Sequence, residues 1–170
     1  MALAQTLTWD KTKTITAVQF LTLLSIATIA PLFHQQWLTG PIVNAMFLIA
    51  VVLLGSQNAI LLALLPSTIA LGVGLLPAVL APMIPFIIIS NVTFILGFHY
   101  LREKNFWLAV AVASVLKFAF LWATSFVVIS LLLKKELATN VSAVMSWPQL
   151  ATALIGGLLA YIFLKKIKKI

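Results

Sequence analysis

The chain alternates between long apolar stretches and short polar breaks. Six apolar stretches can be marked, at residues 15–33, 40–56, 58–75, 79–101, 106–133 and 147–164. Each compares with the roughly 17–25 residues that a helix needs to cross a bilayer. Strands of a β-barrel would be about ten residues of alternating polarity, so helices are expected. The pattern predicts an all-α, polytopic membrane protein with six transmembrane helices, in which residues 1–170 form a single domain.

The composition supports this prediction. Hydrophobic residues make up 63% of the chain and charged residues 8%, whereas soluble domains are roughly 45–50% apolar and about 25% charged. A soluble fold would have too little polar surface to cover its core. The absence of cysteine excludes disulfides, iron–sulfur clusters and thiolate metal sites.

The net charge of +8 is gathered in short clusters between the apolar stretches. Such clusters are typical of sequences that set membrane orientation, and they do not form a nucleic-acid-binding face. With six spans, one side of the bilayer collects eight basic residues: Lys11, Lys13, Arg102, Lys104, Lys165, Lys166, Lys168 and Lys169. The other side has Lys134 and Lys135, partly offset by Glu136. The positive-inside rule then predicts a multi-pass cell-membrane protein with both termini cytoplasmic, whose environment is the lipid bilayer and whose partners include no nucleic acid.

Lys117 lies within the fifth apolar stretch, where a charge is costly and usually marks a pathway or a ligand site. The carboxylate side chains of the chain all lie at segment ends: Asp10, Glu103 and Glu136. At 1.5 Å per residue, Lys117 is roughly 17 and 24 Å from the ends of its helix, too far for simple snorkelling. We expect Lys117 to point into the bundle and to pair with a carboxylate or phosphate of a ligand. The alternative is a structural lysine that donates to carbonyls exposed by proline kinks.

Other polar and aromatic residues suggest where a ligand site lies. We expect it among the fourth, fifth and sixth spans, under the outward-facing loops 34–39 and 134–146. The predicted ligand-binding residues are Asn91, Lys117, Gln149, Trp147, Trp37 and His34. Aromatic rings would stack on a planar ligand while amides fix its orientation. For the two tryptophans, an interfacial aromatic belt is the other interpretation.

Three further features have structural as well as functional interpretations. Asn44 is interpreted mainly as a donor or acceptor of interhelical hydrogen bonds, each worth roughly 0.6–2 kcal/mol. Pro66 is expected to kink the third span. Small residues recur every four positions in the last span and would allow either internal helix packing or contact with another subunit: Thr152, Gly156 and Ala160, with Ala153 and Gly157.

Several chemistries have no support in the sequence. No HExxH, Walker, GxSxG or GxGxxG pattern occurs, and no paired carboxylates are available for acid–base catalysis. His34 and His99 are expected at opposite ends of the membrane, so they cannot share a metal ion. We therefore expect no enzyme, no metal site and no cofactor.

Two segments resemble a known family of membrane proteins. The stretch Gly40-Pro41-Ile42-Val43-Asn44 and the Pro- and Gly-rich residues 65–86 resemble small members of the substrate-binding S components of energy-coupling factor (ECF) transporters. The resemblance implies a subunit that captures a vitamin-like small molecule from outside. It also implies docking through the first helix onto a transmembrane coupling subunit that is driven by ATPase subunits. In that family an AxxxA arrangement makes the contact, whereas here Ala27 and Ala30 are three apart and Ala17 has Leu21 at the fourth position.

The sequence therefore predicts a membrane solute-binding subunit of an ECF-type importer. One alternative is a scaffold or accessory subunit that binds no solute and assembles through its small-residue helix faces. A self-sufficient channel or secondary carrier is a third hypothesis. The shortage of titratable groups in the bundle argues against a proton pump, which would need a relay of such groups.

Overall fold

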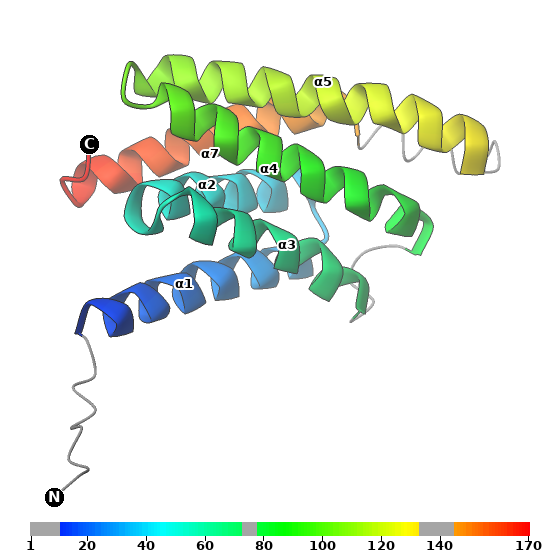
Figure 1. Ribbon diagram of the computed structural model, residues 1–170. Coiled ribbons are helices and arrows are strands. Elements are labelled where there is room, and N and C mark those ends of the chain that lie inside the picture. Colours follow the sequence, from blue (N-terminus) through cyan, green and yellow to red (C-terminus); the bar gives the residue numbers. More distant parts are fainter. Residues whose placement is uncertain (1–10, 73–77, 133–144) are drawn as a thin grey trace, which may run out of the picture.

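The computed structural model describes residues 11–72, 78–132 and 145–170, and all regular structure in them is helical (Figure 1). Its long helices are α1 (Lys11–Ile29), α2 (Gln36–Leu54), α3 (Ser56–Gly72), α4 (Ile84–Leu101), α5 (Phe106–Leu132) and α7 (Trp147–Lys166). Two short 3₁₀ helices, η1 (Ala30–Phe33) and η2 (Ala78–Met83), follow α1 and precede α4. The expected all-α fold is thus confirmed for the described residues.

The connection between α1 and α2 is shorter than expected. His34 adopts a left-handed conformation (φ 51°), Gln35 is extended, and α2 begins at Gln36. The predicted polar loop 34–39 is therefore wrong for residues 36–39, which form the first turn of α2. The Thr39 hydroxyl donates to the Ala30 carbonyl at 2.9 Å and so ties this turn to η1.

Proline acts differently in the third and fourth segments. Helix α3 continues through Pro66 as far as Gly72, whereas the α-helix of the fourth segment begins only at Ile84 and not at residue 79. Pro85 is accommodated in the first turn of α4, where the missing N–H has no intrahelical partner to lose. Pro82 lies in the preceding 3₁₀ turn. Residues 73–77 and most of the expected loop 134–146 lie outside the described residues.

Five helical segments in the described part of the chain are long and apolar enough to cross a membrane. They are Lys11–Phe33, Gln36–Leu54, Ala81–Leu101, Phe106–Val128 and Trp147–Lys166. Helix α3 has 17 residues, which corresponds to about 25 Å of helix. It therefore falls at the lower limit for a span.

The helices run roughly side by side and alternate in direction (Figure 1). Contacts between neighbours close a ring in the order α2, α3, α4, α5, α7 and back to α2, while α1 packs over α2 and α3. The core inside this ring includes the fully buried rings of Phe47, Phe94 and Phe98. Each helix of the ring therefore has one face directed at a common interior.

Helix α5 shows how polarity is distributed between the inside and the outside. Its inner face carries small and polar residues that are buried, among them Ala113, Ser114 and Lys117. Its outer face exposes large apolar residues instead: Trp107, Leu108, Val115, Leu116, Trp122, Phe126 and Val127. A water-soluble protein would rarely expose so large a contiguous apolar surface. This polarity is the reverse of a soluble helix and fits a lipid environment.

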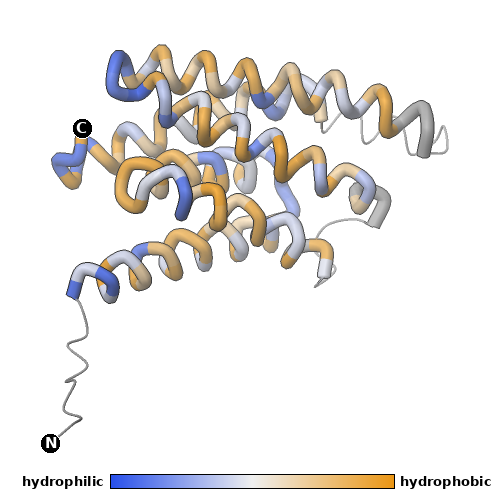
Figure 2. Tube along the Cα trace, viewed as in Figure 1, coloured by the Kyte–Doolittle hydropathy of each residue, from blue (hydrophilic) through white to orange (hydrophobic). Residues whose placement is uncertain are grey.

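Hydrophilic residues gather at one end of the bundle, at the start of α1, the α4–α5 turn and the C-terminus (Figure 2). Arg102 lies in that turn and contacts the same surface hollow as Lys169 near the C-terminus. The eight basic residues that the sequence assigned to one side all belong to these three segments. Lys134, Lys135 and Glu136 lie outside the described residues.

Helix α1 is the least buried of the long helices. Leu23 and Ala27 are its buried residues, followed by Ala30 in η1. Because Ala27 and Ala30 face the bundle, they are not available for docking to another subunit. Ala17 and Leu21, in contrast, are exposed.

Candidate functional site

Lys117 points into the bundle, as expected, and is only 4% exposed. Its ammonium donates to Oδ1 of Asn44 on α2 at 2.6 Å and to Oδ1 of Asn91 on α4 at 2.8 Å. The Nζ atom also lies 5.3 Å from the centre of the Phe94 ring, within cation–π range. One lysine therefore joins three helices of the ring through side-chain contacts.

The hydrogen-bond acceptors of Lys117 differ from those expected if Lys117 were a structural lysine bound to backbone carbonyls. That hypothesis assigned Lys117 to backbone carbonyls exposed by proline kinks, but both hydrogen-bond acceptors in the described structure are side-chain amides. No carboxylate of the described residues lies within ion-pair distance of Lys117, since the ion pair found there joins Arg102 to Glu103 at 3.2 Å. The ammonium is solvated by amides, and its charge has no counter-charge among these residues.

Close packing between α2 and α7 sets the position of Asn44. A Cβ atom added at Gly156 would lie 2.7 Å from Cβ of Asn44 and 2.9 Å from the carbonyl oxygen of Pro41. A Cβ atom at Gly40 would lie 2.7 Å from Cβ of Thr152. Glycine is required at both positions for the two helices to approach so closely. The approach places α2 beside α7 in the ring and brings Asn44 within hydrogen-bond distance of Lys117.

A cavity of about 150 Å³ lies between the helices of the ring, in the half of the bundle near the 34–35 turn. Helix α2 contributes the most lining residues, and α3, α4, α5 and α7 each contribute at least one. The lining residues are Pro31, Gln36, Thr39, Gly40, Val43, Asn44, Pro66, Ser67, Ile87, Asn91, Lys117, Met145 and Gln149. Lys117, Asn44 and Asn91 thus form a polar group at the deep end of a mainly apolar cavity.

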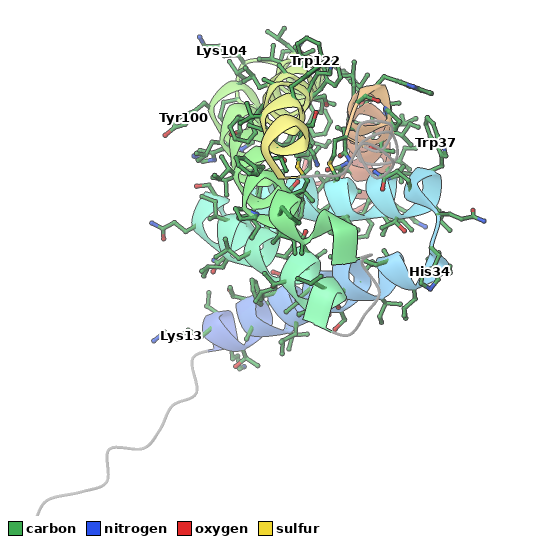
Figure 3. The ribbon with its side chains drawn as sticks, turned by 90° about the vertical axis from the view of Figure 1, so that its right-hand side faces the viewer. Lys13, His34, Trp37, Tyr100, Lys104 and Trp122 are labelled. Carbon is green, nitrogen blue, oxygen red and sulfur yellow. The ribbon has the colours of Figure 1, made fainter. Side chains whose placement is uncertain are left out.

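Three of the six residues expected to bind a ligand line this cavity: Asn91, Lys117 and Gln149. The other three, His34, Trp37 and Trp147, are not among its lining residues and are exposed. Figure 3 shows His34 and Trp37 at the edge of the bundle. The expectation that the pocket lies among the fourth, fifth and sixth spans is too narrow, because α2 and α3 also form its walls.

The two tryptophans nevertheless contact each other. The ring centres of Trp37 on α2 and Trp147 on α7 are 5.1 Å apart, with a tilted arrangement of 52°. Both are more than half exposed, at 51% and 62%. The pair links the first turns of α2 and α7 at the cavity end of the bundle, a position compatible with an interfacial aromatic belt.

Four lining residues were underestimated or overlooked from the sequence. Asn44 was assigned to interhelical hydrogen bonding, which the contact with Lys117 confirms, but it also lines the cavity. Gln36 and Thr39 belonged to a predicted loop, and Ser67 had no assigned role. Their signal was weak because isolated Ser, Thr and Gln residues near helix ends are common in apolar sequences.

Metal binding has no support in the described part of the chain, where no group of three His, Cys, Asp or Glu side chains comes together. His34 and His99 lie at opposite ends of the bundle, at the start of α2 and the end of α4. The arrangement of the cavity can bind and orient a polar solute but offers no acid–base pair.

Comparison of the chain with protein-family models, curated proteins and solved structures found no match.

Proposed function

We propose that this chain is a membrane protein that crosses the cell membrane six times, with both termini in the cytoplasm. The five long apolar helices and the exposed apolar outer face of α5 support insertion of the chain into a membrane. An even number of spans, with α3 as the short one, leaves the eight basic residues at a single end. The positive-inside rule places that end in the cytoplasm. The cavity then lies in the outer half of the protein.

Cysteine labelling tests this topology, because the chain contains no cysteine. Gln35 and Lys104 are both exposed, at opposite ends of the bundle. In intact cells, a membrane-impermeant maleimide should label Gln35→Cys, whereas Lys104→Cys should react only after permeabilisation. Labelling of Lys104→Cys from outside would contradict the orientation and the outward placement of the cavity.

We further propose that the protein is a solute-binding subunit, with binding and not catalysis as its activity. The observation that carries this proposal is the cavity itself, in which Lys117, Asn44 and Asn91 come together from three helices. Intramembrane ionisable residues that face an internal cavity are typically functional. Together with the resemblance to ECF S components, this favours capture of a vitamin-like small molecule from the extracellular side.

The same resemblance supplies the proposed partners, a transmembrane coupling subunit and its ATPase subunits. Helix α1 offers a surface for such docking, because most of its residues are exposed. Ala17, Leu21 and Ser25 follow one another at four-residue intervals on its exposed side. This face would take the place of the buried Ala27 and Ala30.

The scaffold alternative requires small-residue helix faces that are free to bind another subunit. In α7 those residues are engaged within the protein. Thr152 opposes Gly40, Gly156 opposes Asn44, and a Cβ atom at Gly157 would meet the side chain of Val110 on α5. Internal packing thus accounts for the four-residue repeat, and solute binding is the better-supported hypothesis.

Native mass spectrometry tests solute binding directly. We expect the full chain, purified in detergent, to retain a small molecule other than lipid or detergent, which is released on unfolding. Lys117→Met should lose this adduct, and Lys104→Met, the same substitution at an exposed lysine, should keep it. An adduct retained at full occupancy in Lys117→Met would contradict the assignment of the site to this cavity.

A further inference from the structure

The contact with Lys117 fixes the orientation of two cavity-lining amides. A lysine ammonium has three N–H donors and no acceptor, so Asn44 and Asn91 must direct their oxygens toward it. Each therefore turns its NH₂ group away from Lys117. Neither Nδ2 atom forms a hydrogen bond with another residue in the described part of the chain. Because both side chains line the cavity, these NH₂ groups are donors that a ligand can use.

The charge of the cavity also favours a ligand group that accepts hydrogen bonds. Among its lining residues Lys117 is the ionisable one, so any charge on the lining is positive. Attraction between opposite charges is much stronger inside a protein than in water, because the local dielectric constant is low. Two amide donors and an uncompensated ammonium favour a ligand group that is an acceptor and negatively charged.

The rest of the lining indicates an organic body attached to that group. Most of the remaining lining surface is apolar and includes Pro31, Val43, Pro66, Ile87 and Met145, while Gln36, Thr39, Ser67 and Gln149 are its polar members. A bare inorganic anion would leave this surface without a partner. The cavity volume of about 150 Å³ equals that of an engineered protein cavity that holds benzene, so a ligand of about six to nine non-hydrogen atoms fits.

We infer that the cavity binds a small organic monocarboxylate, with the carboxylate at the NH₂ groups of Asn44 and Asn91 and the apolar body against Pro66 and Ile87. In this arrangement Lys117 orients both amides and supplies the positive charge behind them. The inference rests on the proposed solute-binding function and narrows its substrate to a small monoanion.

Thermal unfolding of the purified full chain in detergent tests the inference with five probes. Benzoate is the expected ligand type, and benzamide and benzylamine are its neutral and cationic counterparts of similar size. Naphthoate, the two-ring analogue of benzoate, tests the size limit of the ligand, and chloride tests whether an inorganic anion is sufficient. Benzoate should raise the unfolding temperature in a dose-dependent way, and each of the other four should require at least a tenfold higher concentration for the same shift.

The substitution Asn44→Asp separates ligand recognition from folding. An aspartate at this position still accepts from Lys117, but it removes one donor and cancels the charge of the cavity. We expect the empty variant to unfold at the same or a higher temperature and its affinity for benzoate to fall at least tenfold. Asn105→Asp is the matched control. Asn105 is exposed, and its Oδ1 accepts from the N–H of Leu108 at 2.9 Å, a role that aspartate also fulfils.

The outcomes distinguish this inference from the function on which it rests. A shift with benzamide or benzylamine as large as with benzoate, or a neutral or cationic endogenous solute in native mass spectrometry, would overturn the monoanion class but leave solute binding intact. Undiminished benzoate affinity in Asn44→Asp would overturn the placement of the carboxylate. If no probe shifts unfolding and no solute is retained by the purified chain, both the inference and the proposed function are wrong.

Discussion

Replacing Asn91 by leucine is expected to lower the free energy of unfolding by about 2–3 kcal/mol, because it leaves a buried ammonium with one of its two acceptors missing. Leucine is close to asparagine in size, so the loss of packing is small. The same substitution in a Lys117→Met background should cost less than about 1 kcal/mol, because no buried charge is then left without its partner. The difference between the two costs is the coupling energy of the pair.

The measurement is a double-mutant cycle, with unfolding in mixed detergent followed for the four proteins under identical conditions. Asn58→Leu provides the control. Asn58 lies in the first turn of α3, and its side chain donates to the carbonyl of Leu54 at 2.8 Å. Its replacement should cost the same whether or not Lys117 is present. Equal costs of Asn91→Leu in the two backgrounds would show that Lys117 and Asn91 do not stabilise each other.

Gly156→Ala is expected to destabilise the protein by about 1–3 kcal/mol, because the added methyl group has no room. It would meet Cβ of Asn44 at 2.7 Å, the carbonyl oxygen of Pro41 at 2.9 Å and the backbone nitrogen of Ala45 at 3.0 Å. Two of these atoms belong to the backbone of α2, so a side-chain rotation cannot relieve the contact. Helices α2 and α7 must separate, and Asn44 must move relative to Lys117.

Gly97→Ala is the matched control for this prediction. Gly97 is also within a helix of the ring, but its nearest contact would be at 3.4 Å, to Ala113, which is ordinary van der Waals distance. We expect a change within about 0.5 kcal/mol there. In benzoate titrations, Gly156→Ala should bind more weakly and Gly97→Ala should bind normally. A Gly156→Ala protein as stable as Gly97→Ala would mean that the α2–α7 contact is looser than the structure shows.

Packing and recognition are connected in this protein through the small residues of α7. The missing side chain of Gly156 allows α2 to approach α7 closely and so determines the position of Asn44, whose Oδ1 accepts a hydrogen bond from Lys117. A stability defect at Gly156 should therefore always be accompanied by a binding defect. Trp122 lies on the outer face of α5 and is exposed. Its replacement in Trp122→Leu should therefore leave binding unchanged.

The sequence alone indicated the approximate positions of the helices and placed Lys117 near the middle of a long apolar one. The apolar stretches are long, and their ends are marked by charges, proline or glycine, so α5 and α7 were located to within two residues at each end. The inward direction of Lys117 was also expected from the sequence, because a charge in the middle of a long apolar stretch is costly on the apolar outer surface of a helix. These properties depend on local composition and length.

The tertiary structure decided which residues surround Lys117. Asn44 and Asn91 are 73 and 26 residues away from it along the chain. The packing of α4 against α5, and of α2 and α5 against α7, brings them together. That packing depends on glycines whose effect is the absence of a side chain at one particular contact, so the sequence pattern does not show which of them matter. The same reason kept α2 out of the expected site and made the small residues of α7 ambiguous, because a helix face by itself carries no information about the surface that covers it.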